Sequence, residues 1–331
     1  MKRLLTGDRP TGRLHLGHYV GSLQNRIQLQ SAYDTFIMVA DVQALTDNFA
    51  NPSKVRANVY EVVLDNLAAG IDPDKVTYFI QSQIPEIAEL TVFFLNLVTV
   101  ARLQRNPTVK DEIKQKGFGE SVPAGFFCYP VSQAADILTF MTEVVPVGED
   151  QNPMLEQTRE IADKFNSLYA PIFPRPETIL SKVSRLVGID GNSKMGKSLN
   201  NAIALSDSSE KVEKMIMSMY TDPNRKKASD PGTVEGNPLF IYLDAFGSEK
   251  DYEQIEAFKE RYRTGNVGDV EVKRYLVNVL NTILDPIRAR RIELEKDPNY
   301  IKHILVKGTN RARMVAKETM VSVKRSMQIN Y

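Results

Sequence analysis

Apolar positions in the first half of the chain fall into two kinds of run. Short, continuous runs predict buried strands of a parallel sheet, and they cover residues 4–5, 35–40, 76–80 and 144–147. Between them, apolar residues recur at helical spacing over residues 19–30, 52–69, 85–105 and 153–165. Strands that alternate with helices predict right-handed crossovers and an α/β fold with a Rossmann-like, doubly wound parallel sheet. In such a sheet, ligands bind at the carboxyl ends of the strands.

The pattern changes after about residue 190. Asp207 and Glu210 have the spacing of a capping box, and Val212, Ile216 and Met219 continue a helix at the right interval. A loop punctuated by proline and glycine follows over residues 221–237, and helices are predicted over residues 239–246, 255–262, 272–291 and 310–327. Because no strand is evident among these helices, we expect an all-helical second domain.

Charge is balanced overall but uneven along the chain. The 331 residues include 42 Lys and Arg and 41 Asp and Glu, so a net charge of +1 gives no general attraction for nucleic acid. Residues 286–331, however, hold 11 Lys and Arg against 4 Asp and Glu. Such a segment is either a solvated helix face or a surface that faces RNA.

Cysteine content and hydropathy exclude several classes of protein. A single cysteine, Cys128, excludes an intrachain disulfide framework and a cysteine metal cluster. The apolar run at the start breaks too early for a signal peptide, and no run approaches the roughly 20 apolar residues of a membrane span. We therefore expect a cytoplasmic protein.

A glycine-rich turn follows the first strand. Residues 6–18 read Thr-Gly-Asp-Arg-Pro-Thr-Gly-Arg-Leu-His-Leu-Gly-His and lead into a helix. The free N–H groups and the positive dipole end of such a turn suit a phosphate. His15 and His18 share a helical face, and Gly17 lets a ligand approach the backbone. Taken alone, the two histidines are equally typical of an ordinary surface or core.

A second polar motif lies far downstream, in residues 194–198. They read Lys-Met-Gly-Lys-Ser and offer two lysines and a hydroxyl to a polyphosphate, although an ordinary solvated loop has the same composition. Together, in this order and separated by an α/β stretch, the two motifs resemble the His-Ile-Gly-His and Lys-Met-Ser-Lys-Ser signatures of class I aminoacyl-tRNA synthetases. Leu16 and Gly196 depart from these signatures, and Gly196 removes a hydroxyl and adds backbone freedom.

A third motif narrows the substrate. Residues 129–138 read Tyr-Pro-Val-Ser-Gln-Ala-Ala-Asp-Ile-Leu, which at helical spacing places Gln133 and Asp136 on one face. A carboxylate among alanines and aliphatic residues is costly to bury unless a ligand N–H or O–H donates to it, and an aspartate on the helix surface or at a cap is the alternative. The block resembles the Ala-Ala-Asp-Ile-Leu helix of tryptophanyl-tRNA synthetases, whose aspartate accepts the indole N–H. Its spacing from Gln133 to Asp136 also resembles the tyrosine enzymes.

The resemblance implies a set of site residues. The Gly-Glu-Asp-Gln block at residues 148–151 also resembles the tryptophan family and contributes to this set. The alternative for this block is an ordinary loop between a strand and a helix. Implied catalytic residues are His15, His18, Lys194 and Lys197. Implied ATP-binding residues are Arg9, Gly17, His18, Gly148, Asp150, Lys194, Met195, Lys197 and Ser198. Implied tryptophan-binding residues are Leu5, Tyr129, Gln133, Asp136, Val145, Val147 and Gln151, of which Tyr129 and Gln151 would hold the ammonium group.

The resemblance also implies the chemistry and the partners. The tryptophan carboxylate would attack the α-phosphate of ATP, and tryptophan would then pass to the terminal ribose of tRNA(Trp). ATP would enter with Mg²⁺ as a substrate complex, without a bound prosthetic group, and no residue is assigned as a metal ligand. The two histidines would stabilise the phosphoryl group, and the two lysines would close over pyrophosphate. A homodimer is expected.

The same resemblance divides the chain into parts. Residues 1–189 would form the catalytic domain, with a helical dimerisation insertion at about residues 85–130. Residues 190–204 would form the mobile lysine loop, residues 205–290 the helical domain that binds the tRNA anticodon, and residues 291–331 a basic helical segment that packs back towards the catalytic domain.

Three other functions stay open at this stage. The nearest is tyrosyl-tRNA synthetase, although bacterial members usually add an RNA-binding domain for which this length leaves no room. A small-molecule nucleotidyltransferase with a similar histidine turn would have little need of a long helical domain. A non-catalytic tRNA-binding paralogue is the third alternative, and the presence of His15, His18, Lys194 and Lys197 argues against it.

Overall fold

The computed structural model of the chain describes residues 1–148, 151–180, 186–191, 195–196, 199–222, 224–225, 227 and 229–331. Within these residues, five parallel strands form one sheet in the order β3-β2-β1-β4-β5. They are β1 (Arg3–Asp8), β2 (Asp34–Val39), β3 (Val76–Ile80), β4 (Val144–Val147) and β5 (Glu177–Leu180). The predicted α/β fold with a parallel sheet is confirmed. The strand order reverses between β1 and β4, which is where a doubly wound sheet opens a crevice for ligands.

Strand β5 is the strand that the sequence does not predict. It has four residues, it lies at the edge of the sheet beside β4, and its two end residues, Glu177 and Leu180, are exposed. A short, half-exposed edge strand lacks a continuous apolar run, and it is this run that predicts β1, β2, β3 and β4 from the sequence.

The continuous apolar runs reflect burial on both faces of the sheet. In β2, Phe36 and Met38 join a core on one face, whereas Ile37 and Val39 join a separate core on the opposite face. Successive side chains of a strand point to opposite faces, so a strand covered on both sides has no polar face. Helices α5 (Pro85–Leu95), α8 (Ala124–Thr139) and α9 (Asn152–Leu168) contribute to the first core, and α4 (Pro52–Ala69) contributes to the second.

Two helices of this first half, over residues 41–48 and 107–116, are not predicted, and the others follow the prediction with one exception. The helices are α1 (Leu16–His18), a π-helical turn (Tyr19–Leu23), α2 (Gln24–Leu29), α3 (Asp41–Asn48), α4 (Pro52–Ala69), a 3₁₀ turn (Gln81–Gln83), α5 (Pro85–Leu95), α6 (Val100–Arg105), α7 (Pro107–Lys116), α8 (Ala124–Thr139) and α9 (Asn152–Leu168). The single helix predicted over residues 85–105 is wrong. It is broken because the Thr99 side chain accepts from the Arg102 N–H and starts α6 as a new helix.

The polar run that follows α6 is also helical. The Asn106 side chain accepts from the N–H groups of Thr108 and Val109, which fixes the start of α7. Val109 is buried, so α7 packs against the body of the protein although half of its side chains are charged.

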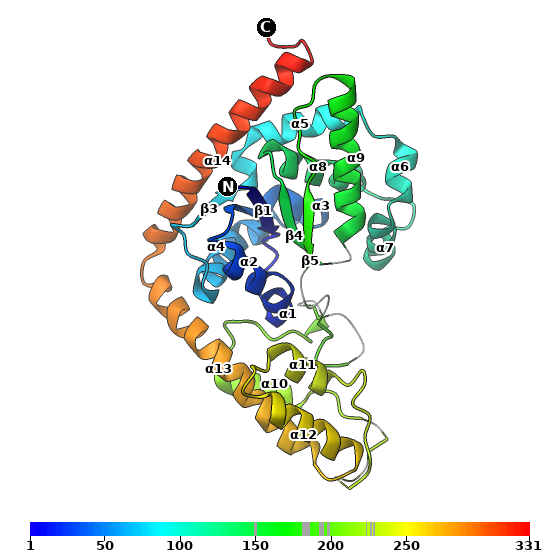
Figure 1. Cartoon of the computed structure of the whole chain (residues 1–331), viewed down its shortest axis with the longest axis vertical. Helices are drawn as coiled ribbons and strands as arrows, with labels where there is room; N and C mark the ends of the chain where they lie inside the picture. The colour runs from blue at the N-terminus through cyan, green and yellow to red at the C-terminus, as the bar shows by residue number, and fades with distance from the viewer. Residues whose placement is uncertain are drawn as a thin grey trace.

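The regular elements of the second half, within its described residues, are helices joined by loops. Its helices are α10 (Ser209–Met217), α11 (Pro238–Phe246), α12 (Tyr252–Arg263), α13 (Asp269–Glu295) and α14 (Pro298–Ser326). Figure 1 shows α10, α11 and α12 gathered at one end of the molecule, with α13 and α14 running along one side towards the sheet. Helix α10 is capped by Ser208 rather than by Asp207, and α14 begins at Pro298, well before the predicted residue 310. None of the described helices is long and apolar enough to cross a membrane.

Helix α14 covers the edge strand β3. A Cβ atom added to Gly308 would lie 1.8 Å from the carbonyl oxygen of Tyr78, so only glycine permits this close approach. The next residue, Thr309, accepts from the Ile80 N–H at 3.3 Å, and Arg311 donates to Asp34 at 2.7 Å. An exposed strand edge invites pairing with other chains, and α14 prevents it here by burying β3.

Candidate active site

The histidine turn lies at the carboxyl end of β1 and is held from two sides. The Leu16 N–H donates to the Ile203 carbonyl at 3.0 Å, and the Leu205 N–H donates to the Leu14 carbonyl at 2.9 Å. From the other side, the Leu14 N–H donates to the buried Asp65 carboxylate at 2.6 Å. The turn is therefore fixed by segments that come before and after the lysine motif in the chain.

Asp65 connects this turn to helix α13. Its second oxygen pairs with the buried Arg291 guanidinium, which also donates to Glu61 at 2.7 Å. Burial raises the pKa of Asp65 above its ordinary value, and the field of Arg291 opposes that shift. The contact joins the helical half of the chain to the histidine turn.

The two histidine rings lie against each other with centroids 3.8 Å apart. His15 Nδ1 accepts from the Gly17 N–H at 3.2 Å, and His18 Nδ1 accepts from the His15 N–H at 3.2 Å. Because Nδ1 of each ring is an acceptor, the proton of the neutral ring resides on Nε2. Each ring therefore has a donor directed away from its own backbone.

Gly17 and Met195, both predicted to bind ATP, lie next to these histidines. The Gly17 N–H lies 3.3 Å from the Met195 sulfur, and a Cβ atom on Gly17 would lie 3.1 Å from the His15 ring. Beside Met195, the Gly196 N–H donates to the Asn201 side chain at 2.8 Å. The other assigned residues of this region, Asp150, Lys194, Lys197 and Ser198, lie outside the described residues.

A cavity of about 350 Å³ opens beside the turn, between the carboxyl ends of β1 and β4. All seven residues assigned to tryptophan line it: Leu5, Tyr129, Gln133, Asp136, Val145, Val147 and Gln151. Arg9 and Gly148, assigned to ATP, line it as well, whereas His15, His18, Gly17 and Met195 do not. The structure thus gathers the predicted residues into two adjacent groups.

Arg9 is already paired in this structure. Its guanidinium and the Lys116 ammonium both contact the carboxylate of Asp47, which lies on α3 and is nearly buried. The contact ties the turn after β1 to the end of α7, and Arg9 is its one member that lines the cavity.

Asp136 is deeply buried in the cavity wall, with 2% of its surface exposed, the same fraction as Arg26. Its Oδ1 accepts from the Gln81 amide at 2.7 Å. Burial raises the pKa of Asp136 to about 8, because a single neutral donor compensates only part of the lost hydration and Asp41 adds repulsion. A ligand donor at the second oxygen would favour the ionised form.

Tyr129 has an acidic partner. Its hydroxyl donates to Glu112 of α7 at 2.8 Å, and both residues line the cavity. Burial raises the pKa of Tyr129 above its ordinary value, and the negative charge of Glu112 adds to the shift. Glu112 therefore places a negative charge beside the Tyr129 hydroxyl, and the positive charge of Arg9 opposes its effect on the pKa of Tyr129.

Sequence reasoning misses Gln81 and Glu112. A signal for Gln81 exists, because it directly follows β3 and polar residues at the carboxyl end of a parallel strand face the ligand crevice. Glu112 gives no such signal, since it lies in a charged helix that is typical of a solvated surface.

A second buried aspartate near the cavity is fully compensated. Asp8, at the end of β1, accepts from the Arg26 guanidinium at 2.5 and 2.9 Å and from the Asn66 amide at 2.9 Å. Burial alone would raise the pKa of Asp8, but Arg26 and Asn66 outweigh it and hold the pKa below its ordinary value. Arg26 also lines the cavity, so this ion pair forms part of its floor.

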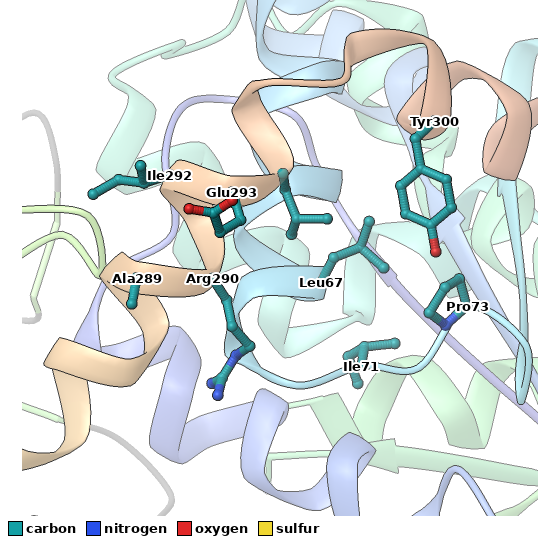
Figure 2. Close-up of a pocket in the computed structure, with 9 residues that line it drawn as sticks. Leu67, Ile71, Pro73, Ala289, Arg290, Ile292, Glu293 and Tyr300 are labelled. Carbon is teal, nitrogen blue, oxygen red and sulfur yellow. The ribbon is translucent and has the colours of Figure 1, made fainter.

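A larger hollow of about 630 Å³ lies elsewhere, where the end of α4 meets α13 and α14. Figure 2 shows its lining, with Tyr300 pointing towards Pro73. Its charged groups are bonded within the protein, because Arg290 donates to the Ala68 carbonyl at 2.6 Å and Glu293 pairs with Lys296. It brings together none of the predicted site residues.

Comparisons with known proteins agree with the geometry. The profile of the family tRNA synthetases class I (W and Y) matches residues 1–285. The tryptophan–tRNA ligase of Streptococcus mutans serotype c is 55% identical over 334 residues, and the alignment covers 99% of this chain and 98% of the relative. That of Lactococcus lactis is 54% identical with the same coverage.

A solved structure is similar over the same extent. The crystal structure of tryptophanyl-tRNA synthetase from Campylobacter jejuni, complexed with ADP and tryptophan, superposes with a TM-score of 0.84. It is 32% identical in sequence, and the match covers 98% of this chain and 99% of that one. Similarity in sequence and in fold therefore extends over nearly the whole chain.

Proposed function

The chain belongs to the class I tRNA synthetases of the tryptophan and tyrosine group, and on that premise we propose that it is a tryptophan–tRNA ligase. It activates L-tryptophan with ATP and then transfers tryptophan to the terminal adenosine of tRNA(Trp). The observation that carries the proposal is Asp136, a buried carboxyl with one neutral protein donor, in a cavity of about 350 Å³ that apolar and polar side chains line together.

Asp136 selects the indole ring. Indole is apolar except for one N–H, and the cavity combines aliphatic side chains such as Leu5 and Val145 with the deeply buried carboxyl of Asp136. A site built around a hydrogen bond rejects ligands without the donor far better than an apolar pocket can. Relatives more than 50% identical are named tryptophan–tRNA ligases, which favours tryptophan over tyrosine.

Tyr129 and Gln151 hold the substrate ammonium. Both line the cavity, and Glu112 adds negative charge beside the Tyr129 hydroxyl. An ammonium group near these oxygens keeps the amino-acid carboxylate directed towards the histidine turn. Gln133, Val145 and Val147 shape the remaining walls.

Activation forms a bond between a carboxylate oxygen of tryptophan and the α-phosphorus of ATP. The bond from that phosphorus to pyrophosphate breaks, and pyrophosphate leaves with its charge shared by Mg²⁺ of the substrate complex. His15 and His18 donate from Nε2 to the phosphoryl oxygens, where negative charge is concentrated in the transition state. No nucleophile from the protein is needed.

The remaining assigned residues bind ATP around this centre. Gly17 lets the nucleotide approach the backbone, Gly148 and Asp150 lie beside the ribose, and Arg9 and Met195 bound the site. Lys194 and Lys197, with Ser198, close over the departing pyrophosphate, so that loop closure is part of catalysis. In the second step, the ribose hydroxyl of tRNA attacks the acyl carbon and AMP leaves.

The helical half binds tRNA. We assign residues 1–189 to catalysis, residues 190–204 to the lysine loop, residues 205–290 to anticodon binding and residues 291–331 to the segment that returns to the sheet. The path of α13 from the helical end to the sheet supports this division, because Arg291 on that helix contacts Asp65 beside the histidine turn.

A homodimer would form through the insertion at about residues 85–130. Val92, Leu95 and Val100 lie on α5 and α6 with their apolar side chains exposed, as expected of a face that a second copy covers. Light scattering is expected to give twice the chain mass, and Val92→Glu is expected to shift it towards the monomer.

The test of the proposed function is ATP–pyrophosphate exchange by the purified protein with Mg²⁺, run side by side with tryptophan and tyrosine. Exchange with tryptophan alone is the expected result. Exchange with tyrosine would overturn the assignment of Asp136 to indole while keeping the reaction, and exchange with neither would contradict the proposed reaction.

A further inference from the structure

Gln81 lies behind the acceptor of the cavity. It follows β3 directly, in the 3₁₀ turn Gln81–Gln83, and 2% of its surface is exposed. Gln81 does not line the cavity, but its amide contacts Asp136, and Asp136 lines the cavity. A buried amide in this position acts on any ligand through the carboxyl group that it touches.

The orientation of the Gln81 amide is determined by a backbone contact. Its Oε1 accepts from the Gln43 N–H at 3.0 Å, and its Nε2 donates to Asp136 Oδ1 at 2.7 Å. The amide nitrogen is only a donor and the amide oxygen only an acceptor, so a reversed amide would lose both contacts. Oδ1 of Asp136 is consequently always the atom that accepts from the protein.

This arrangement determines which oxygen of Asp136 faces a ligand and influences whether the carboxyl group is protonated or ionised. With Oδ1 engaged, a proton on the carboxyl resides on Oδ2, and an ionised carboxylate presents Oδ2 as an acceptor. The donor from Gln81 stabilises the ionised form, whereas burial and the carboxylate of Asp41 on α3 disfavour it. Asp41 is itself fixed, since it accepts from the Ser82 N–H and hydroxyl at 2.9 and 2.6 Å.

We propose that Gln81 is a positioning residue for amino-acid selection: it holds Asp136 as an acceptor aimed at the indole N–H. The inference rests on the proposed function, because it assumes that tryptophan occupies the cavity. It assigns a role in specificity to a residue that does not touch the substrate.

The test compares Gln81→Met with Gln83→Met. Methionine keeps the length of glutamine and removes the donor, and Gln83 belongs to the same turn but is exposed. For Gln81→Met, the KM for tryptophan in ATP–pyrophosphate exchange is expected to rise about 10- to 100-fold, the range for losing a hydrogen bond to a charged group. The KM for ATP is expected to change less than about threefold, and Gln83→Met is expected to resemble the wild type.

A tryptophan analogue separates positioning from a merely structural role. In 3-benzothienylalanine, sulfur replaces the indole N–H, so this ligand has no donor from which Asp136 could accept a hydrogen bond. For this analogue as an inhibitor of exchange, Gln81→Met is expected to change Ki less than about threefold, whereas it weakens tryptophan strongly. Equal weakening of both ligands would mean a structural role and would overturn the proposal, as would an unchanged KM for tryptophan.

A pH titration tests the inference without turnover. The Asp136 carboxyl, followed by ¹³C NMR in the ligand-free protein, is expected to titrate at higher pH in Gln81→Met than in Gln83→Met. Identical titrations would overturn the proposal even if the variant is too inactive for kinetics. Failure of the wild type to exchange with tryptophan would instead count against the proposed function, so the two failures are distinguishable.

Discussion

Asp8 and Asp136 are both buried beside the same cavity, yet their surroundings are opposite. Asp8 faces the Arg26 guanidinium and the Asn66 amide, which together hold its pKa below the ordinary value. Asp136 faces one neutral amide, and burial raises its pKa to about 8. The sheet therefore holds one carboxylate whose charge is compensated within the protein and one whose charge is not.

The difference separates a structural group from a binding group. The Asp8 carboxylate accepts from Arg26 twice and from Asn66 once, so the charge of Asp8 is balanced within the protein and the pair fixes the floor of the cavity. A buried carboxyl with a single neutral donor is incompletely satisfied, and a ligand donor completes it. Incomplete satisfaction of Asp136 is thus the physical reason for proposing it as the group that binds the substrate.

The largest expected effect is on stability, at the compensated carboxylate. Arg26→Met leaves Asp8 buried without a counter-charge, and the free energy of unfolding is expected to fall by about 3–5 kcal/mol. Urea unfolding measures it. Arg13→Met is the control, because Arg13 forms an exposed pair with Glu61 and is expected to cost less than about 1 kcal/mol. A similar, small loss for both variants would remove the contrast between Asp8 and Asp136.

The next effect is on substrate affinity, at the uncompensated carboxyl. Asp136→Ala removes the acceptor and is expected to raise the KM for tryptophan about 100-fold, the size expected of a hydrogen bond to a charged group. The KM for ATP is expected to change only a few-fold, since the histidine turn is untouched. Exchange kinetics with each substrate varied in turn provide the measurement, and equal changes in both constants would contradict the assignment of Asp136.

A third effect is the pH dependence of tryptophan binding. The free protein holds Asp136 largely protonated below its pKa of about 8, and an indole donor favours the ionised form. Binding is therefore expected to strengthen up to tenfold per pH unit as pH rises from 6 towards 8 and to level off above it. Calorimetry at pH 7 in buffers of different ionisation enthalpy should show release of nearly one proton, which Asp136→Asn should abolish.

The smallest effect is expected away from both carboxylates. Gly196→Ser restores the hydroxyl of the family signature and reduces backbone freedom in the lysine motif, so kcat for activation is expected to change a few-fold. Tryptophan affinity, followed by equilibrium binding, is expected to stay within about twofold of the wild type. A large loss of tryptophan affinity would mean that the lysine motif and the cavity are not independent.

Local pattern predicts the parts of the fold that are uniformly buried or clearly capped. The bounds of β3 and α4 agree with the prediction, and Gly70 ends α4 in the left-handed region with a φ of 118°. Strand β5 and the break between α5 and α6 are not predicted, because an exposed edge strand carries little apolar signal and a threonine cap is a single polar residue.

The sequence by itself determined the motifs, the alternation of strands and helices, and which side chains carry the proposed chemistry. The tertiary structure alone decided how each buried charge is compensated. Gln81 lies 55 residues from Asp136 along the chain, and Arg291 lies 226 residues from Asp65. Hydrophobic periodicity reports on neighbours a few residues apart, whereas the pKa of a buried carboxyl depends on donors that the fold brings within hydrogen-bonding distance.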